Sequence, residues 1–199
     1  MSSLSAPLTP TQSTLIGRIF PALQSLSALK FIVLALLGSA LLVLSSKIII
    51  PFYPVSISMQ SFMVIALGCL YGSRLATATV TLYLFEGAIG IPVFQGPGAG
   101  IIYMISVPTA GYLVGFVLSA YSVGRLFEYG LGRSVLSAAL LFVIGAVIID
   151  IPGLIWLTHL VGFDLAKTTY LTYQYAFLLK TGLGAMSVPA LWHHHSVEK

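Results

Sequence analysis

The chain has 199 residues, of which 58% are hydrophobic and only 7% are charged. A soluble domain carries roughly 25% charged residues, so this composition excludes an ordinary water-exposed surface and predicts a protein embedded in a lipid bilayer. The net charge of +4 comes from scattered basic residues. They form no basic run with interleaved aromatic residues, which argues against a nucleic-acid partner.

Residues 1–27 are rich in Ser, Thr and Pro and predict a polar tail with room for a short interfacial helix. Apolar stretches of about 20 residues then recur, each bounded by Gly, Pro or charge. We therefore expect an all-α integral membrane protein, with a single membrane domain at 28–192 and a polar C-terminal tail at 193–199. Six transmembrane helices are predicted, at residues 28–47, 58–73, 74–90, 101–121, 134–158 and 171–192.

The second and third expected helices share one apolar stretch, which only the sequence YGSR at 71–74 interrupts. A single helix there would reduce the number of spans to five. Glycine followed by serine and arginine suits a tight turn between helices, however, and two spans fit the 33 residues of 58–90 better than one.

The charge of the short loops predicts the orientation in the membrane. With six spans, both termini share a side with the loops at 72–74 and 122–133, and most basic residues lie there: Arg18, Lys30, Arg74, Arg125, Arg133 and Lys199. The opposite side holds only Lys47 and Lys167, so the positive-inside rule places both termini in the cytoplasm. Three loops then face outward, at residues 48–60, 90–100 and 159–170.

Three ionisable residues lie well inside the expected helices, namely Glu86, Asp150 and Lys180. A charge at a helix centre costs about 2.5 to 3.5 kcal/mol, so each should face protein or water. A rise of about 1.5 Å per residue puts all three beneath the outer loops. The lysine suits an anionic ligand and the acids suit its N–H groups. Structural pairing between helices is the alternative.

Aromatic and amide residues at the same depth are candidates for the rest of a binding site. We expect aromatic walls and polar contacts from Tyr53, Tyr83, Phe94, Trp156, Gln60 and Gln95. The loop GIPVFQGPGAG at 90–100 begins four residues after Glu86, and its glycines and prolines predict a short, shaped lid that places Phe94 on the ligand. Simple packing and a plain turn between helices are the alternatives.

The chain carries no GxxxxGK[ST] nucleotide-binding loop, no HExxH metal motif and no GxSxG nucleophile motif. We therefore expect no enzyme activity, no cofactor and no metal site. An intramembrane enzyme that uses Glu86 and Asp150 as an acid pair is a remote alternative.

Four segments resemble, in order and spacing, the BioY family of biotin transporters: YPVSISMQSF at 53–62, LYLFEGAIGIPVF at 82–94, GPGAG at 96–100 and VPTAGYLVGF at 107–116. The resemblance extends over roughly residues 28–192. It implies a six-helix S component of an energy-coupling-factor (ECF) uptake system, with multiple passes through a prokaryotic cell membrane. It further implies that the protein binds biotin near the outer face.

The resemblance also suggests individual residues. The family lysine near the start of the last helix corresponds to Lys180 in AFLLKTG, but the family pattern is close to PxxPGDxxK and Phe177 occupies the position of its aspartate. Asp150 or Glu86 is our hypothesis for the substitute acid. Another anionic vitamin is the alternative ligand.

Family members work with a transmembrane coupling subunit and two ATPases, or alone or as oligomers, which the resemblance extends to this chain. The segment ALLGSA at 35–40 places Ala35 and Ser39 at i and i+4, and such small residues allow close approach of a partner helix. Packing within the chain itself is the alternative.

Overall fold

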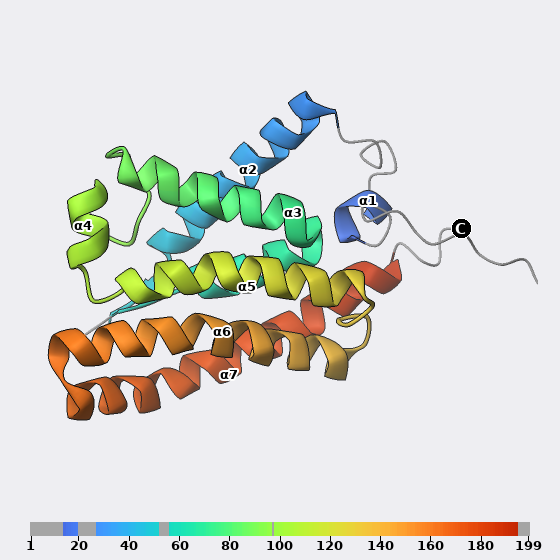
Figure 1. The fold of residues 1–199 in the computed structure, drawn as a ribbon. Coiled ribbons are helices and arrows are strands. Elements are labelled where there is room, and N and C mark those ends of the chain that lie inside the picture. The colour runs from blue at the N-terminus through green and yellow to red at the C-terminus, as the bar shows by residue number, and fades with distance from the viewer. Residues whose placement is uncertain (1–13, 20–26, 52–55, 97, 195–199) are drawn as a thin grey trace, which may run out of the picture.

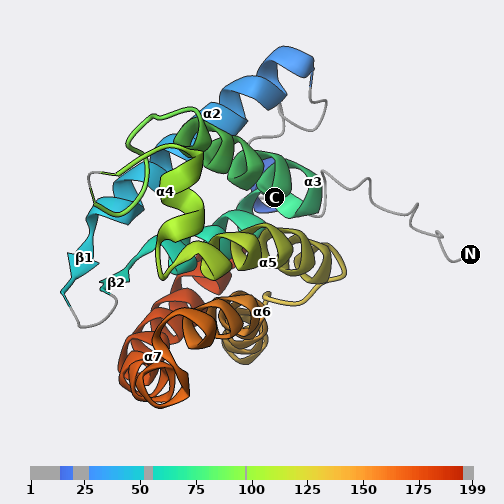
Figure 2. The same cartoon turned by 60° about the vertical axis from the view of Figure 1, so that its left-hand side comes forward.

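We describe the chain from a computed structural model, which covers residues 14–19, 27–51, 56–96 and 98–194. The described residues form helices (Figure 1) and one short two-stranded hairpin (Figure 2). The helices are α1 (Leu15–Ile19), α2 (Ala28–Lys47), α3 (Gln60–Ala88), α4 (Ile101–Ser106), α5 (Ala110–Glu128), α6 (Val135–Val161) and α7 (Phe163–His194). The antiparallel strands are β1 (Ile49–Ile50) and β2 (Ile57–Ser58).

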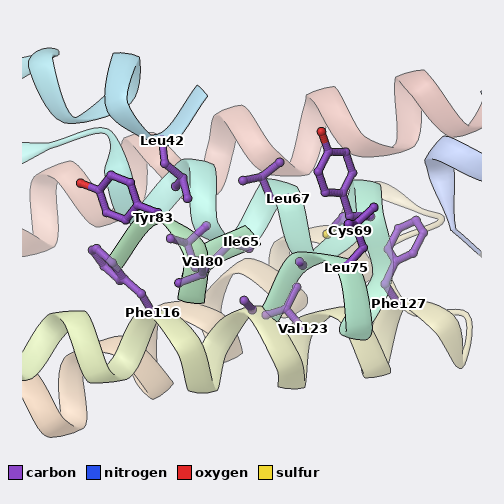
Figure 3. Close-up of a cluster of buried hydrophobic side chains, with 14 of the residues drawn as sticks. Leu42, Ile65, Leu67, Cys69, Leu75, Val80, Tyr83, Phe116, Val123 and Phe127 are labelled. Carbon is purple, nitrogen blue, oxygen red and sulfur yellow. The ribbon is translucent and has the colours of Figure 1, made fainter. Parts of the chain in front are cut away.

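The long helices pack in series, with α2 on α3, α3 on α5, α5 on α6 and α6 on α7 (Figures 1 and 2). Apolar side chains of the facing helices are buried along this series. Figure 3 shows part of the resulting core, which includes Leu42, Leu67, Val80, Tyr83, Val123 and Phe127. Helix α2 lies at the edge of the bundle and leaves an apolar face exposed, as a lipid-facing helix does.

Helix α3 reverses direction at Gly72, whose φ of 76° is readily adopted only by glycine. Gln60 Nε2 donates a hydrogen bond to Tyr83 Oη at 2.6 Å, although 23 residues of straight helix would span about 35 Å. Glu128, from the end of α5, accepts hydrogen bonds from Ser73 N at 2.8 Å and Ser73 Oγ at 2.9 Å. This carboxylate satisfies free donors at the start of the second half of α3, as an N-cap would. The reversal falls within the predicted turn at 71–74.

Two predictions about neighbouring segments, in contrast, are wrong. The segment 101–121 is not one helix, because Val107 is extended before Pro108 and the chain divides there into α4 and α5. The segment 159–170 is not an open loop either. Helix α6 continues to Val161 and α7 begins at Phe163, so the connection is reduced to Gly162 with its φ of 85°.

The ends of the bundle gather segments that are distant in the sequence. The β1–β2 hairpin, the loop at 89–100 with α4, and the turn between α6 and α7 lie at one end (Figures 1 and 2). The reversal of α3 and the connection from α5 to α6 lie at the other. These are the two groups of loops that the sequence assigns to opposite sides of the membrane. Four described helices are long and apolar enough to cross a membrane, namely α2, α3, α5 and α6.

The N-terminal tail contributes α1, whose Leu15 and Ile16 are buried against the bundle. The small residues of α2 also face inward. Ala35 and Ser39 are buried, and a Cβ on the intervening Gly38 would meet the Thr79 side chain at 2.6 Å. Ala35, Gly38 and Ser39 therefore pack within this chain, and their contact with a partner helix stays a prediction.

Close approach of α5 and α6 gives a testable stability effect. A Cβ on Gly111 would lie 2.2 Å from the backbone oxygen of Pro152, whereas a Cβ on Gly182 of α7 would meet nothing within 4 Å. Because backbone cannot move aside as a flexible side chain can, we expect Gly111→Ala to cost about 3 kcal/mol and to lower the melting temperature in detergent by about 5–10 °C. Gly182→Ala, the matched control, should be neutral or slightly stabilising. Equal melting temperatures would contradict the close crossing.

Candidate ligand-binding cavity

A cavity lies among α3, α5, α6 and α7, at the end of the bundle where the hairpin, the loop at 89–100 and α4 gather. Regular helix periodicity explains which side chains reach it. On α6 the lining positions are 142, 146, 149 and 150, and on α7 they are 173, 174, 176, 177, 180 and 181. Spacings of three and four residues mark one face of a helix, so each helix presents a single face to the cavity.

Lys180 and Asp150 both line the cavity, on neighbouring helices α7 and α6. Lys180 Nζ donates a hydrogen bond to Ser61 Oγ at 2.9 Å. Within the described part of the chain, the Asp150 carboxylate accepts no hydrogen bond and forms no ion pair within 4.0 Å with Lys180, although the two charges attract one another. A cation and an acceptor are therefore both available to a bound molecule.

Gln60, Phe94 and Gln95 also line the cavity, and the first two are buried. Tyr83 is fully buried behind Gln60 and Phe94 and contacts both residues. Its hydroxyl accepts a hydrogen bond from Gln60, and its ring meets the Phe94 ring edge-on, with 5.5 Å between ring centres and 89° between ring planes. Phe94 further stacks on Tyr103 at 6.5 Å between ring centres. This cluster holds the loop at 89–100 against the cavity.

The remaining predicted site residues lie elsewhere. Glu86 is absent from the described cavity lining, and its carboxylate instead accepts a hydrogen bond from the Ser39 hydroxyl of α2. Trp156 donates from Nε1 to the Val107 oxygen at 3.0 Å and borders a separate apolar hollow beside α4 and α5. Tyr53 lies outside the described residues.

The structure adds lining residues that sequence reasoning missed, among them Ser61, Tyr112, Tyr173 and Gln174. A signal existed for some of them. Tyr173, Gln174 and Phe177 precede Lys180 by seven, six and three residues, so the helical face that carries the lysine already indicated them. Ser61 follows Gln60 directly, and only the three-dimensional structure brings it to Lys180.

Comparison with known proteins gives a consistent result. A sequence profile of the BioY family matches residues 18–196. The probable biotin transporter BioY of Pyrococcus horikoshii is 34% identical over 137 residues, which cover 69% of this chain and 80% of the relative. The biotin transporter BioY of Thermotoga maritima is 31% identical over 118 residues, covering 56% and 69% respectively.

A solved structure has the same fold. It is the crystal structure of the S-component for biotin from an ECF-type ABC transporter, with a TM-score of 0.73 over 85% of this chain and 95% of that one. Sequence identity to it is 20%, so this likeness supports the helical arrangement and not the identity of individual site residues.

Proposed function

The chain belongs to the BioY family, a family of multi-pass membrane transporters, and from that premise we propose that it is the membrane subunit that captures biotin for uptake. One observation carries the proposal beyond family membership. The cavity has largely apolar walls that contain the Lys180 ammonium and the Asp150 carboxylate, which accepts no hydrogen bond from the described residues. A ligand with an anionic end and an N–H-bearing end requires this combination.

Biotin has these two ends. Its carboxylate pairs with the Lys180 ammonium, and its ureido N–H groups donate to the Asp150 carboxylate, which takes the part of the aspartate that Phe177 replaces. Its fused rings pack against apolar and aromatic walls, including Phe94 and Phe177. Binding of this kind is reversible and involves no covalent step, so the protein acts as a binding subunit and not as an enzyme.

The proposal extends to the setting in the membrane. We place the protein in the plasma membrane of a prokaryotic cell with six crossings, two of them from the halves of α3, and with both termini in the cytoplasm. The cavity then opens toward the outside, where an imported vitamin arrives. Energy for the release of biotin to the inside comes from an ECF coupling subunit and its two ATPases. The alternative is that this chain transports biotin without those partners.

Thermal stability in detergent tests the proposed ligand. A ligand that binds only the native state stabilises it by mass action, by about 2.7 kcal/mol at a concentration 100 times the dissociation constant. We expect micromolar biotin to raise the melting temperature, and thiamine, a cation, to leave it unchanged. No shift with biotin would refute the assignment, and a shift with a different anionic vitamin would identify that vitamin as the ligand.

A further inference from the structure

The loop that follows α3, described at residues 89–96 and 98–100, is held by side chains that do not line the cavity. Lys47, the last residue of α2, donates from Nζ to the oxygens of Pro92 at 3.1 Å and Phe94 at 2.8 Å. The Ser46 hydroxyl, beside it, lies 2.9 Å from the oxygen of Val93 and 2.7 Å from that of Val43, and it shares its one proton between these two acceptors. Neither Lys47 nor Ser46 is among the described residues that line the cavity.

The second half of α3 contacts the same stretch. The Tyr83 hydroxyl donates to the Val93 oxygen at 3.0 Å, so this carbonyl accepts two hydrogen bonds. Three consecutive loop carbonyls are thus bound by side chains of the bundle. Carbonyl groups in an outer loop commonly bond to water, which allows the loop to move. Here the backbone is fixed on either side of Val93, a residue that is 3% exposed.

The polar residues of α2 have a common orientation. Ser46 and Lys47 follow Ser39 by seven and eight residues, spacings that fall within one broad stripe along a helix. Ser39 donates to Glu86, at the end of α3 that leads into the loop, while Ser46 and Lys47 bind the loop itself. All three side chains therefore bond to atoms within residues 86–94.

We propose that Lys47 and Ser46 form a latch that keeps residues 92–94 of this loop in place, with Phe94 against the cavity, and that the latch controls how fast the ligand leaves. They are positioning residues, because they act on the ligand through the backbone of residues 92–94. The inference concerns the regulation of the proposed biotin site and, for its kinetic part, rests on that function. Opening the loop requires these hydrogen bonds to break.

The kinetic test measures dissociation of radiolabelled biotin from detergent-purified protein. Loss of the ammonium in Lys47→Met removes two hydrogen bonds, so we expect dissociation to be about five to ten times faster. Ser46→Ala should accelerate it about threefold, and Lys47→Arg, which still donates, should restore most of the wild-type rate. Lys167→Met is the matched control, because Lys167 is also exposed and, among the described residues, makes no hydrogen bond to this loop. Wild-type dissociation from both Lys47→Met and Ser46→Ala would overturn the latch.

A second test needs no ligand. The sole native cysteine, Cys69, is fully buried, so a cysteine introduced as Val93→Cys is the site that a thiol reagent can report. In the absence of biotin we expect labelling of Val93→Cys to become about ten times faster when Lys47→Met is added, and to stay slow when Lys167→Met is added. Equal labelling rates would refute the latch even if biotin binds. Faster labelling in a protein that does not bind biotin would support the latch while rejecting the proposed function.

Discussion

Replacing Lys180 with Met is expected to weaken biotin binding by about 100-fold or more. Removing one partner of a buried, hydrogen-bonded charge pair costs roughly 2–5 kcal/mol, and each 1.4 kcal/mol is a factor of ten in affinity. Lys180 is half-buried in the cavity lining, and among the described residues its ammonium donates a hydrogen bond only to Ser61. Methionine has a similar length and no charge, so the variant removes the cation with little change in volume.

The uncharged biotin amide separates a lost ion pair from general damage. Wild-type protein should prefer biotin over the amide by a large factor, and Lys180→Met should bind both about equally, because only the acid has a charge for the lysine to meet. Ser61→Ala serves as the companion variant, since it removes the partner of the ammonium and keeps the cation. A similar loss of affinity for acid and amide would show that Lys180 does not bind the carboxylate.

Much of the fold follows from local sequence chemistry. The reversal of α3 was predictable because Gly72 permits a positive φ where a long apolar stretch must turn. The break at Pro108 was also encoded locally and was missed, because hydropathy averages over a window and does not register a single proline. The sharp turn at Gly162 was hidden for a related reason: Asp164 and Lys167 lower the hydropathy at the start of α7, so a helical segment resembled a loop.

The sequence predicts the depth of each candidate site residue in the membrane but not the direction in which its side chain points. Counting residues along a helix gives the height of a side chain in the membrane, and Glu86, Asp150 and Lys180 are similar by that measure. The face on which each lies depends on the neighbouring helices. The second half of α3 packs on α2, which directs Glu86 to Ser39, whereas α6 and α7 direct Asp150 and Lys180 into the cavity.

Asp150 and Glu86 allow a matched comparison of two acids. The loss of affinity in the Asp150 variant is the second large effect that we expect. Asp150→Asn should weaken biotin binding by about 30-fold, because a neutral amide oxygen is a much poorer acceptor for ureido N–H groups than a carboxylate. Glu86→Gln should change the affinity by less than about threefold. The Glu86 carboxylate lies off the cavity, and a glutamine oxygen can still accept the hydrogen bond from Ser39.

The comparison is informative because both variants remove one negative charge at a similar depth while retaining the shape of the side chain. A general electrostatic effect on Lys180 would weaken binding in both, whereas a direct contact with the ligand weakens it in Asp150→Asn alone. Isothermal titration with biotin measures both affinities, and melting temperatures without ligand verify that each variant is folded. Unchanged affinity in Asp150→Asn would show that Asp150 does not contact biotin. A large loss of affinity in Glu86→Gln alone would show that Glu86, on α3, is the acid that contacts it. Because Asp150 and Lys180 come from adjacent helices, a ligand that bridges them also holds α6 against α7.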